Sequence, residues 1–325
     1  MKTLYVGDPH CTVEEIPDCT ALMGLVWQEA MAEGVDQVII LGDLHNNFAV
    51  TNVHVTDFWR TQLKKLATLC PVIALVGNHD MLGNGQSRPH ALVAYDDIVT
   101  VIDTPTKLED TLYIPYLPEP NLFHRAVAGF PLAKRIVCHQ EFNGAQYDNG
   151  FFAPNGVDPG LMQVPVLSGH IHTPQRVGRG EGSVWYPGAP RWRNLSDASV
   201  SERFLYILDD DFKVLSEIAT SPHVKVIHDI NIKPDTAHIV HMYARKDEYR
   251  IRVEGTAAFV KDQLAKLAVY EQGNKKISTN ITDSRVVRVR ESDGIDVAFQ
   301  KYVTAFKPKN GTQPEALVQM AANRL

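Results

Sequence analysis

The pattern of hydrophobic and polar positions has a regular rhythm over the first quarter of the chain. Short apolar runs at residues 4–6, 38–41 and 72–76 each end in a glycine that is followed by aspartate or asparagine. Between them, apolar residues recur at helical spacing in residues 20–33 and 55–66. This rhythm predicts buried strands that alternate with helices. In such folds, ligands bind on the loops at the carboxyl ends of the strands.

Further along, apolar runs continue with fewer helical patterns between them. They predict strands at residues 98–102, 111–114, 136–138, 164–167, 183–186 and 204–208. We expect the last two to form a meander, which makes the fold a mixed α/β sandwich flanked by helices and not a purely parallel sheet. Residues 143–159, rich in Gly, Asn and Pro, predict a loop that borders a substrate cleft.

The pattern of hydrophobic and polar residues changes after about residue 222. Residues 249–253 alternate as a strand, residues 257–270 have a helical pattern, and residues 286–289 read as another strand, which together predict a small β-α-β module. A last helix is expected at residues 295–306, before Pro308. The predicted organisation is a catalytic domain at 1–222, a small α+β capping-like domain at 223–292, and a C-terminal helical segment at 293–325 for docking a partner.

Composition narrows the class of protein. The chain has 325 residues, of which 44% are hydrophobic and 22% charged, as in ordinary globular proteins. No apolar run approaches the roughly 20 residues that cross a membrane, and the N-terminal run is too short for a signal peptide. The four cysteines form no CxxC pair, so we expect free thiols, buried or partly buried, in a reducing cytoplasm.

The net charge of the chain is −6, and its charged residues are unevenly distributed along the sequence. Residues 223–325 contain 17 basic and 12 acidic side chains, whereas residues 1–222 contain 15 basic and 26 acidic ones. An acidic part that needs divalent cations, followed by a mildly basic part, suits an enzyme that acts on a polyanion.

Five polar patches carry candidate chemistry, and four of them directly follow a predicted strand. They are Asp8-Pro9-His10, Gly42-Asp43-Leu44-His45-Asn46, Gly77-Asn78-His79-Asp80, Cys138-His139-Gln140 and Gly169-His170-Ile171-His172. Carboxylate, imidazole and amide oxygen are suitable ligands for Mn²⁺, Fe or Zn²⁺. His170 and His172 are one residue apart on an extended segment, so they point to opposite sides and can serve different ions.

A single histidine is more often structural or solvated than a metal ligand. We interpret eight of the thirteen histidines in this way: His45, His54, His90, His124, His223, His228, His238 and His241. The five patches together, in order and at strand ends, predict a site for two metal ions.

These patches resemble the calcineurin-like metallophosphoesterases, whose pattern is D-x-H, G-D, G-N-H-D/E, H and G-H-x-H. Within that superfamily the chain is most similar to the SbcD-type nucleases, which partner an SMC-like coiled-coil ATPase in DNA double-strand-break processing. The similarity to that branch rests on His139-Gln140, on residues 169–175 (GHIHTPQ) and on residues 186–190 (YPGAP). It extends over residues 1 to about 210, and the later module resembles the capping domain of that branch only in layout.

The resemblance implies a role for each matching position. Asp8, His10 and His172 would hold one ion, Asp43 would bridge, and Asn78, His139 and His170 would complete the shell of the second. His79 would contact the scissile phosphate, and Asp80 would orient its imidazole. Two Mn²⁺ ions are expected, with Fe or Zn²⁺ as alternatives.

One position departs from the branch pattern. Three residues after the bridging aspartate, SbcD-type nucleases commonly have a histidine that contacts the substrate phosphate, whereas this chain has Asn46, with His45 beside it. Either His45 takes that place from a shifted loop, or the substrate is contacted differently. Arg191 and Arg193 are candidate phosphate contacts or surface residues, and Trp185 and Trp192 are assigned to core packing.

The function implied by the resemblance is hydrolysis of DNA phosphodiesters through a metal-bridging hydroxide, by an exo- or endonuclease subunit of an SbcCD-type complex. DNA and an SMC-like ATPase are the expected partners, and homodimerisation is left open. One alternative is a stand-alone phosphatase or cyclic-nucleotide phosphodiesterase with the same site. Another is a non-catalytic scaffold subunit, which the intact His79-Asp80 pair argues against.

Overall fold

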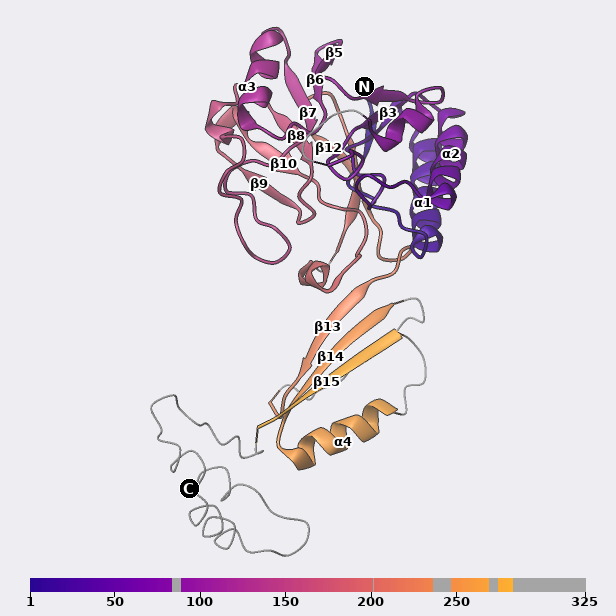
Figure 1. Ribbon diagram of the computed structural model, residues 1–325, viewed down its shortest axis with the longest axis vertical. Helices are drawn as coiled ribbons and strands as arrows, with labels where there is room; N and C mark the ends of the chain where they lie inside the picture. Colours follow the sequence, from indigo (N-terminus) through magenta and orange to yellow (C-terminus); the bar gives the residue numbers. More distant parts are fainter. Residues whose placement is uncertain (84–88, 201, 236–246, 269–273, 283–325) are drawn as a thin grey trace, which may run out of the picture. The chain divides into compact units, whose positions relative to one another are not determined.

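The computed structural model describes the chain in two compact units (Figure 1). The residues that it describes are 1–83, 89–200, 202–235, 247–268 and 274–282. Among them, the first unit contains residues up to 229 together with 247–249, and the second contains the others.

The first sheet of the first unit has six strands in the order β12-β11-β1-β2-β3-β4. They are β1 (Thr3–Val6), β2 (Gln37–Ile40), β3 (Val72–Leu75), β4 (Thr100–Ile102), β11 (Phe204–Leu208) and β12 (Val214–Ala219). Strands β1 to β4 are parallel, whereas β11 pairs antiparallel with both β1 and β12. The carboxyl ends of β1, β2 and β3 therefore lie at one edge.

The second sheet also has six strands, in the order β5-β6-β7-β8-β10-β9. They are β5 (Thr106–Leu108), β6 (Thr111–Ile114), β7 (Arg135–His139), β8 (Val166–Gly169), β9 (Gln175–Val177) and β10 (Val184–Tyr186). The four central strands are parallel, and β5 and β9 are antiparallel edge strands. Strands β7 and β8 thus also end at a common edge.

The two sheets pack face to face, with helices on their outer faces. Tyr5 and Ile39 of the first sheet form a core with Val137 of the second, whereas the alternate residues Leu4 and Val38 pack with helical side chains. Helices α1 (Ile16–Glu33) and α2 (Val53–Ala67) cover the first sheet, and α3 (Pro120–Gly129) covers the second (Figure 1). Burial on both faces explains why the strands are continuously apolar.

The mixed α/β sandwich predicted from the sequence is confirmed, but the predicted meander is wrong. Strands β10 and β11 belong to different sheets, and Gly188 lies in the connection between them. Gly188 has φ +81, and a Cβ there would lie 2.6 Å from the His172 carbonyl oxygen. Helix α3 was not predicted. All four cysteines are buried and unpaired, as expected.

The second unit contains one helix and most of a three-stranded sheet, whose residues 227–229 and 248–249 belong to the first unit. Its sheet has the order β13-β14-β15, with β13 (Ile227–Ile232), β14 (Glu248–Gly255) and β15 (Asn274–Ile281), and its helix is α4 (Ala257–Ala268). The structure thus has a strand directly after α4 that the sequence did not predict, because its residues NKKISTNI lack apolar alternation. The predicted strand at 286–289 and helix at 295–306 lie outside the described residues. Within the described part of the chain, no helix is both long and apolar enough to span a bilayer.

Candidate dinuclear metal centre

The polar patches meet at one end of the sandwich. The candidate ligands Asp8 and His10 follow β1, Asp43 follows β2, Asn78 follows β3, His139 is the last residue of β7, and His170 and His172 follow β8. Parallel neighbours end at the same edge of a sheet, so each sheet gathers its own ligands. Close packing of the two sheets then brings both sets together.

One group of ligand atoms contains Asp8, His10 and His172. Their ligand atoms lie within 4.8 Å of one another. The Nε2 atoms of His10 and His172 are only 2.9 Å apart, and His10 Nε2 lies 3.4 Å from Asp43 Oδ2. Two imidazoles and two carboxylates thus converge on one point.

A second group shares Asp43 with the first. Asp43 Oδ2 lies 3.4 Å from His139 Nε2, and Asn78 Oδ1 lies 3.0 Å from the same nitrogen and 2.8 Å from His170 Nδ1. Asp43 Oδ2 is therefore equally close to His10 and to His139. This is the position that a bridging carboxylate between two cations requires.

The donor set fits divalent cations. Asp8 Oδ1 is buried and has no hydrogen-bond partner among the described residues, which is costly for a carboxylate unless a cation approaches it. The Nε2 atoms of His10 and His172, which face each other at 2.9 Å, are also suitably placed to bind one cation together. The ligands are carboxylate oxygens, imidazole nitrogens and one amide oxygen, which suit Mn²⁺, Fe or Zn²⁺.

Burial and the carboxylates set the protonation of these groups. Burial raises the pKa of Asp8 to about 6 and lowers that of His10 well below its usual value. Burial also opposes charge on His139, but Asp43 and Asp8 outweigh it and raise its pKa to about 9. The cluster thus already favours a positive charge beside its two central carboxylates.

The backbone has an unusual conformation at three of the candidate ligands. His10, Asp43 and His170 have φ values of +45°, +51° and +84°, which non-glycine residues rarely adopt. A Cβ on Gly77 would lie 2.1 Å from Asp43 Oδ1, so only glycine fits there. Strained backbone of this kind is found where surrounding structure holds a functional side chain in place.

His79 lies beside the ligands. Its ring centroid is 4.7 Å from that of His10, and its backbone N–H donates to Asp43 Oδ1 at 2.8 Å. Its Nδ1 lies 2.7 Å from the carbonyl oxygen of Asn46, which can only accept, so Nδ1 carries the proton. Burial lowers the pKa of His79, so the neutral ring is favoured.

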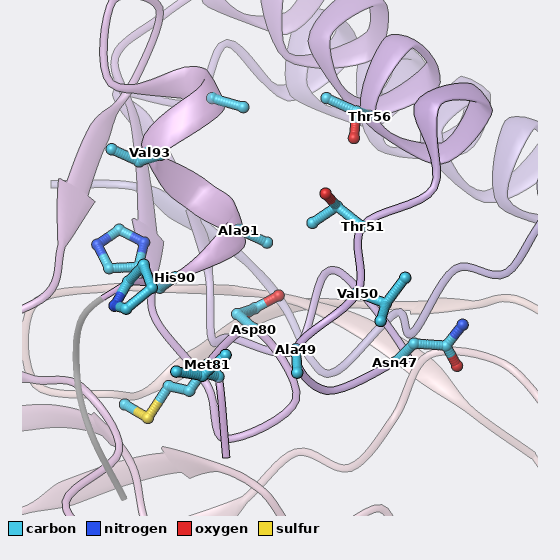
Figure 2. A pocket seen from close by; sticks show the side chains of 13 residues that line it. Asn47, Ala49, Val50, Thr51, Thr56, Asp80, Met81, His90, Ala91 and Val93 are labelled. Atoms are coloured by element: carbon cyan, nitrogen blue, oxygen red, sulfur yellow. The ribbon is translucent and has the colours of Figure 1, made fainter.

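Asp80 does not orient the His79 imidazole, which corrects the expectation from the sequence. Its carboxylate accepts from the backbone N–H of His45 at 3.0 Å and of Gly77 at 3.1 Å. It lies in the wall of a neighbouring pocket of about 260 Å³, together with Thr51 and Ala91 (Figure 2). Asp80 therefore joins the loops that follow β2 and β3, and the Asn46 carbonyl holds the His79 ring.

His45 does not take the place of the missing histidine. Its side chain is buried, with Nε2 2.9 Å from the hydroxyl of Tyr95, and burial lowers its pKa to about 4. It is a neutral core residue, in agreement with its interpretation as structural. The Asn46 side chain instead accepts a hydrogen bond from Arg193, and the Asn46 carbonyl oxygen contacts His79.

Arg191 is buried, which contradicts both interpretations from the sequence, a phosphate contact and a surface residue. It is fully buried, and its guanidinium donates to the carbonyl oxygens of Pro9 and His10. It also pairs with Glu15 at 3.1 Å. Arg191 therefore holds the turn that carries Asp8 and His10. Trp192 is fully buried and Trp185 nearly so, as predicted.

Four residues near the site had no predicted role. The Phe48 ring lies 4.1 Å from the His79 ring, and the Tyr116 ring lies 5.5 Å from that of His170. Asp148 and Glu141 approach the two histidines after β8. Among them, only Asp148 lies in the predicted loop at 143–159, and that prediction did not specify a side chain.

Comparison with known proteins agrees with this geometry. The sequence model of the calcineurin-like phosphoesterase family matches residues 1–227. Protein 244L of Invertebrate iridescent virus 6, which carries the name of a phosphoesterase, is 28% identical over 226 residues, covering 64% of this chain and 77% of its own. Protein 078R of Invertebrate iridescent virus 3, named in the same way, is 28% identical over 205 residues, covering 58% and 57%.

Two solved structures are also similar. The phosphoesterase Yfce from E. coli matches 67% of this chain and 99% of its own at 18% identity, with a TM-score of 0.31. The Pseudomonas putida nuclease MPE matches 65% and 85% at 19% identity, with a TM-score of 0.33. The family match covers more than half of the chain, including every candidate ligand. The chain belongs to the calcineurin-like phosphoesterases, a family of metal-dependent hydrolases of phosphoester bonds.

Proposed function

We propose that this phosphoesterase is a nuclease that hydrolyses DNA phosphodiesters with two Mn²⁺ ions. The observation that carries the proposal is the position of Asp43 Oδ2, 3.4 Å from the ligand nitrogens of both His10 and His139. It lies between the group of Asp8, His10 and His172 and the group of Asn78, His139 and His170, and the His79 ring lies beside His10. Such a site suits in-line displacement at phosphorus.

The bound cations would neutralise the phosphate and activate water, and the chain supplies the alignment. Asp8, His10 and His172 would hold one ion, and Asn78, His139 and His170 the other, with Asp43 between them. His79 uses Nδ1 for the Asn46 carbonyl, so its other nitrogen, Nε2, is the one available to the substrate. We assign it a hydrogen bond with a phosphate or leaving-group oxygen.

Aromatic side chains near the site favour a nucleic acid over a simple phosphate ester. Phe48, which contacts the His79 ring, is 45% exposed. Phe151 and Phe152 are more exposed still, and they lie on the loop that carries Asp148 beside His172. Aromatic rings bind successive bases by stacking, whatever their sequence. Phe48 beside His79, and the exposed rings on the loop that carries Asp148, would thus offer surfaces for the bases that flank the scissile bond.

The test is hydrolysis of labelled single- and double-stranded DNA by the purified chain with Mn²⁺, beside a small chromogenic phosphodiester. Substitution His79→Ala is expected to lower both rates by about 10²–10⁴-fold, the usual contribution of an acid–base group. The matched control is His54→Ala, an exposed histidine on α2, which should leave both rates unchanged. Chelation of the metal should abolish both.

The second candidate is a phosphatase or cyclic-nucleotide phosphodiesterase, and Asn46 is the observation that favours it. An amide held by Arg193 stands where the nuclease branch has histidine. Hydrolysis of the small ester with DNA left intact would establish this function instead. If the chain hydrolyses neither substrate in the presence of metal, this result would support the scaffold alternative.

A partner ATPase of the SMC-like coiled-coil type is part of the same proposal. Its predicted docking segment, residues 293–325, lies outside the described residues. Co-expression with such an ATPase and size-exclusion chromatography would test it. Binding that is lost when residues 293–325 are deleted would support the proposal, and separate elution of the two full chains would contradict it. The mass of the isolated chain, 36.3 kDa for a monomer, would show whether it forms a homodimer.

A further inference from the structure

The loop between β7 and β8 approaches both histidines of the His170-Ile171-His172 segment. Glu141 Oε2 lies 3.9 Å from His170 Nε2, and Asp148 Oδ2 lies 3.2 Å from His172 Nδ1. Both carboxylates are half-buried, with side-chain exposures of 23% and 14%. Glu141 thus approaches His170, and Asp148 approaches His172. Asp197 also lies near Asp148 and His172, but it pairs with Arg203 at 2.8 Å.

The two rings use opposite nitrogens. His170 presents Nδ1 to Asn78 Oδ1 at 2.8 Å and turns Nε2 toward Glu141. His172 presents Nε2 to His10 at 2.9 Å and turns Nδ1 toward Asp148. An ionised carboxylate only accepts hydrogen bonds, so His172 Nδ1, at hydrogen-bond distance from Asp148, carries the proton. Glu141 lies beyond hydrogen-bond distance, and its charge favours the proton on His170 Nε2. With a cation between His170 Nδ1 and Asn78 Oδ1, both rings would direct a lone pair at the metal centre.

Both carboxylates are held in place by hydroxyl groups. Thr173 Oγ1 donates to Asp148 Oδ1 at 2.7 Å, and the Tyr147 hydroxyl donates to Glu141 Oε2. These hydroxyl groups hold each carboxylate beside the histidine nitrogen that it faces.

We propose that Asp148 and Glu141 are positioning residues that fix the tautomers of His172 and His170, each for a different metal ion. One loop then controls the affinity of both halves of the centre. Carboxylates that hold a metal-binding histidine typically change metal affinity by 10–100-fold when they are removed. The effect should be larger for Asp148, because 3.2 Å is a shorter approach than 3.9 Å.

The test uses Asp148→Asn, Glu141→Gln and the double variant, each as a full chain stripped of metal. The control is Glu217→Gln, which removes the same charge from an exposed position on β12. Bound Mn²⁺ is counted during titration, and electron paramagnetic resonance distinguishes a spin-coupled pair from an isolated ion. We expect Asp148→Asn to bind one ion normally and the other about 10–100-fold more weakly, with the spectrum of an isolated ion between the two steps. The double variant should bind both ions weakly.

A second comparison separates positioning from loop anchoring. Thr173→Val removes the hydroxyl that holds Asp148 but keeps the carboxylate next to His172. It should weaken metal binding clearly less than Asp148→Asn. Equal weakening in both variants would overturn the proposal, because the loop and not the carboxylate would then matter. Two ions bound with unchanged affinity in Asp148→Asn would overturn it as well. These readouts do not depend on whether DNA is the substrate.

Discussion

Asp43 contacts three site residues with one buried side chain. Its Oδ2 approaches His10 and His139 equally, and its Oδ1 accepts the backbone N–H of His79. The same carboxylate that would bridge the cations therefore also places the residue that would contact the substrate. Its positive φ fixes the direction of the side chain.

The Asp80 carboxylate accepts hydrogen bonds from two backbone N–H groups, and we therefore predict that it contributes to stability. In Asp80→Asn one carboxylate oxygen becomes an NH₂ group that cannot accept from His45 or Gly77. A buried donor left without its acceptor costs about 1–3 kcal/mol, so the free energy of unfolding should fall by that amount. Urea denaturation of the metal-free chain measures it.

The control for this prediction is Asp97→Asn, which removes an exposed carboxylate that pairs with Arg60. No measurable change is expected there, because exposed ion pairs contribute little. Lower activity of Asp80→Asn with unchanged stability would show instead that Asp80 acts directly on the reaction.

At the scale of elements, short turns after parallel strands build the centre. Strands β1, β2, β3, β7 and β8 each end within three residues of a candidate ligand. Small residues let these turns approach one another, and the Gly77 position faces Asp43 directly. A side chain at that position would displace the bridging carboxylate.

Two glycine substitutions test this. Gly77→Ala places a Cβ 2.1 Å from Asp43 Oδ1, and the turn must shift to relieve the contact. We expect loss of Mn²⁺ binding and at least about a 10²-fold lower rate, since displacement of about 1 Å costs that much. Gly24→Ala is the control, because Gly24 lies on α1 with nothing within 4 Å of its Cβ position.

Gly24→Ala should stabilise the chain by about 0.4–1 kcal/mol, because alanine has the higher helix propensity and a more restricted unfolded state. Metal titration and thermal unfolding of both variants check the pair. Normal metal binding by Gly77→Ala would contradict the role of this turn.

At the scale of the whole molecule, the centre lies where two sheets meet. One sheet supplies Asp8, His10, Asp43 and Asn78, and the other supplies His139, His170 and His172. Neither set is complete without the other, so binding of the cations links the two layers. The second unit supplies none of these ligands.

This linkage predicts that metal raises the stability of the first unit. A ligand at 100 times its Kd stabilises the folded state by about 2.7 kcal/mol per site, so saturating Mn²⁺ should raise the melting temperature by several degrees. Asp43→Asn should remove most of the increase, because it weakens both sites. Differential scanning calorimetry with and without a chelator measures it. An unchanged melting temperature in the wild-type chain would contradict the linkage.

The amino-acid sequence determined the features that depend on local pattern. Continuous apolar runs predicted the central strands, because both faces of those strands are buried. The Gly-Asp and Gly-Asn pairs at their ends marked Asp8, Asp43 and Asn78 as candidates, because parallel neighbours end at one edge. These signals are short-range, so a single sequence contains them. The full set of seven candidate ligands came from the resemblance to the calcineurin-like family.

Contacts between distant segments were decided only by the tertiary structure. Strands β10 and β11 belong to different sheets although they are neighbours along the chain. Arg191 donates a hydrogen bond to the carbonyl oxygen of Pro9, which is 182 positions away in the sequence. The residues next to Arg191 therefore give no sign that it is buried. Asp80 accepts hydrogen bonds from backbone groups, and backbone donors are the same in every sequence except at proline. The partners of His170 and His172 come from a loop whose pattern shows neither helix nor strand, and only the folded chain brings Glu141 and Asp148 to them.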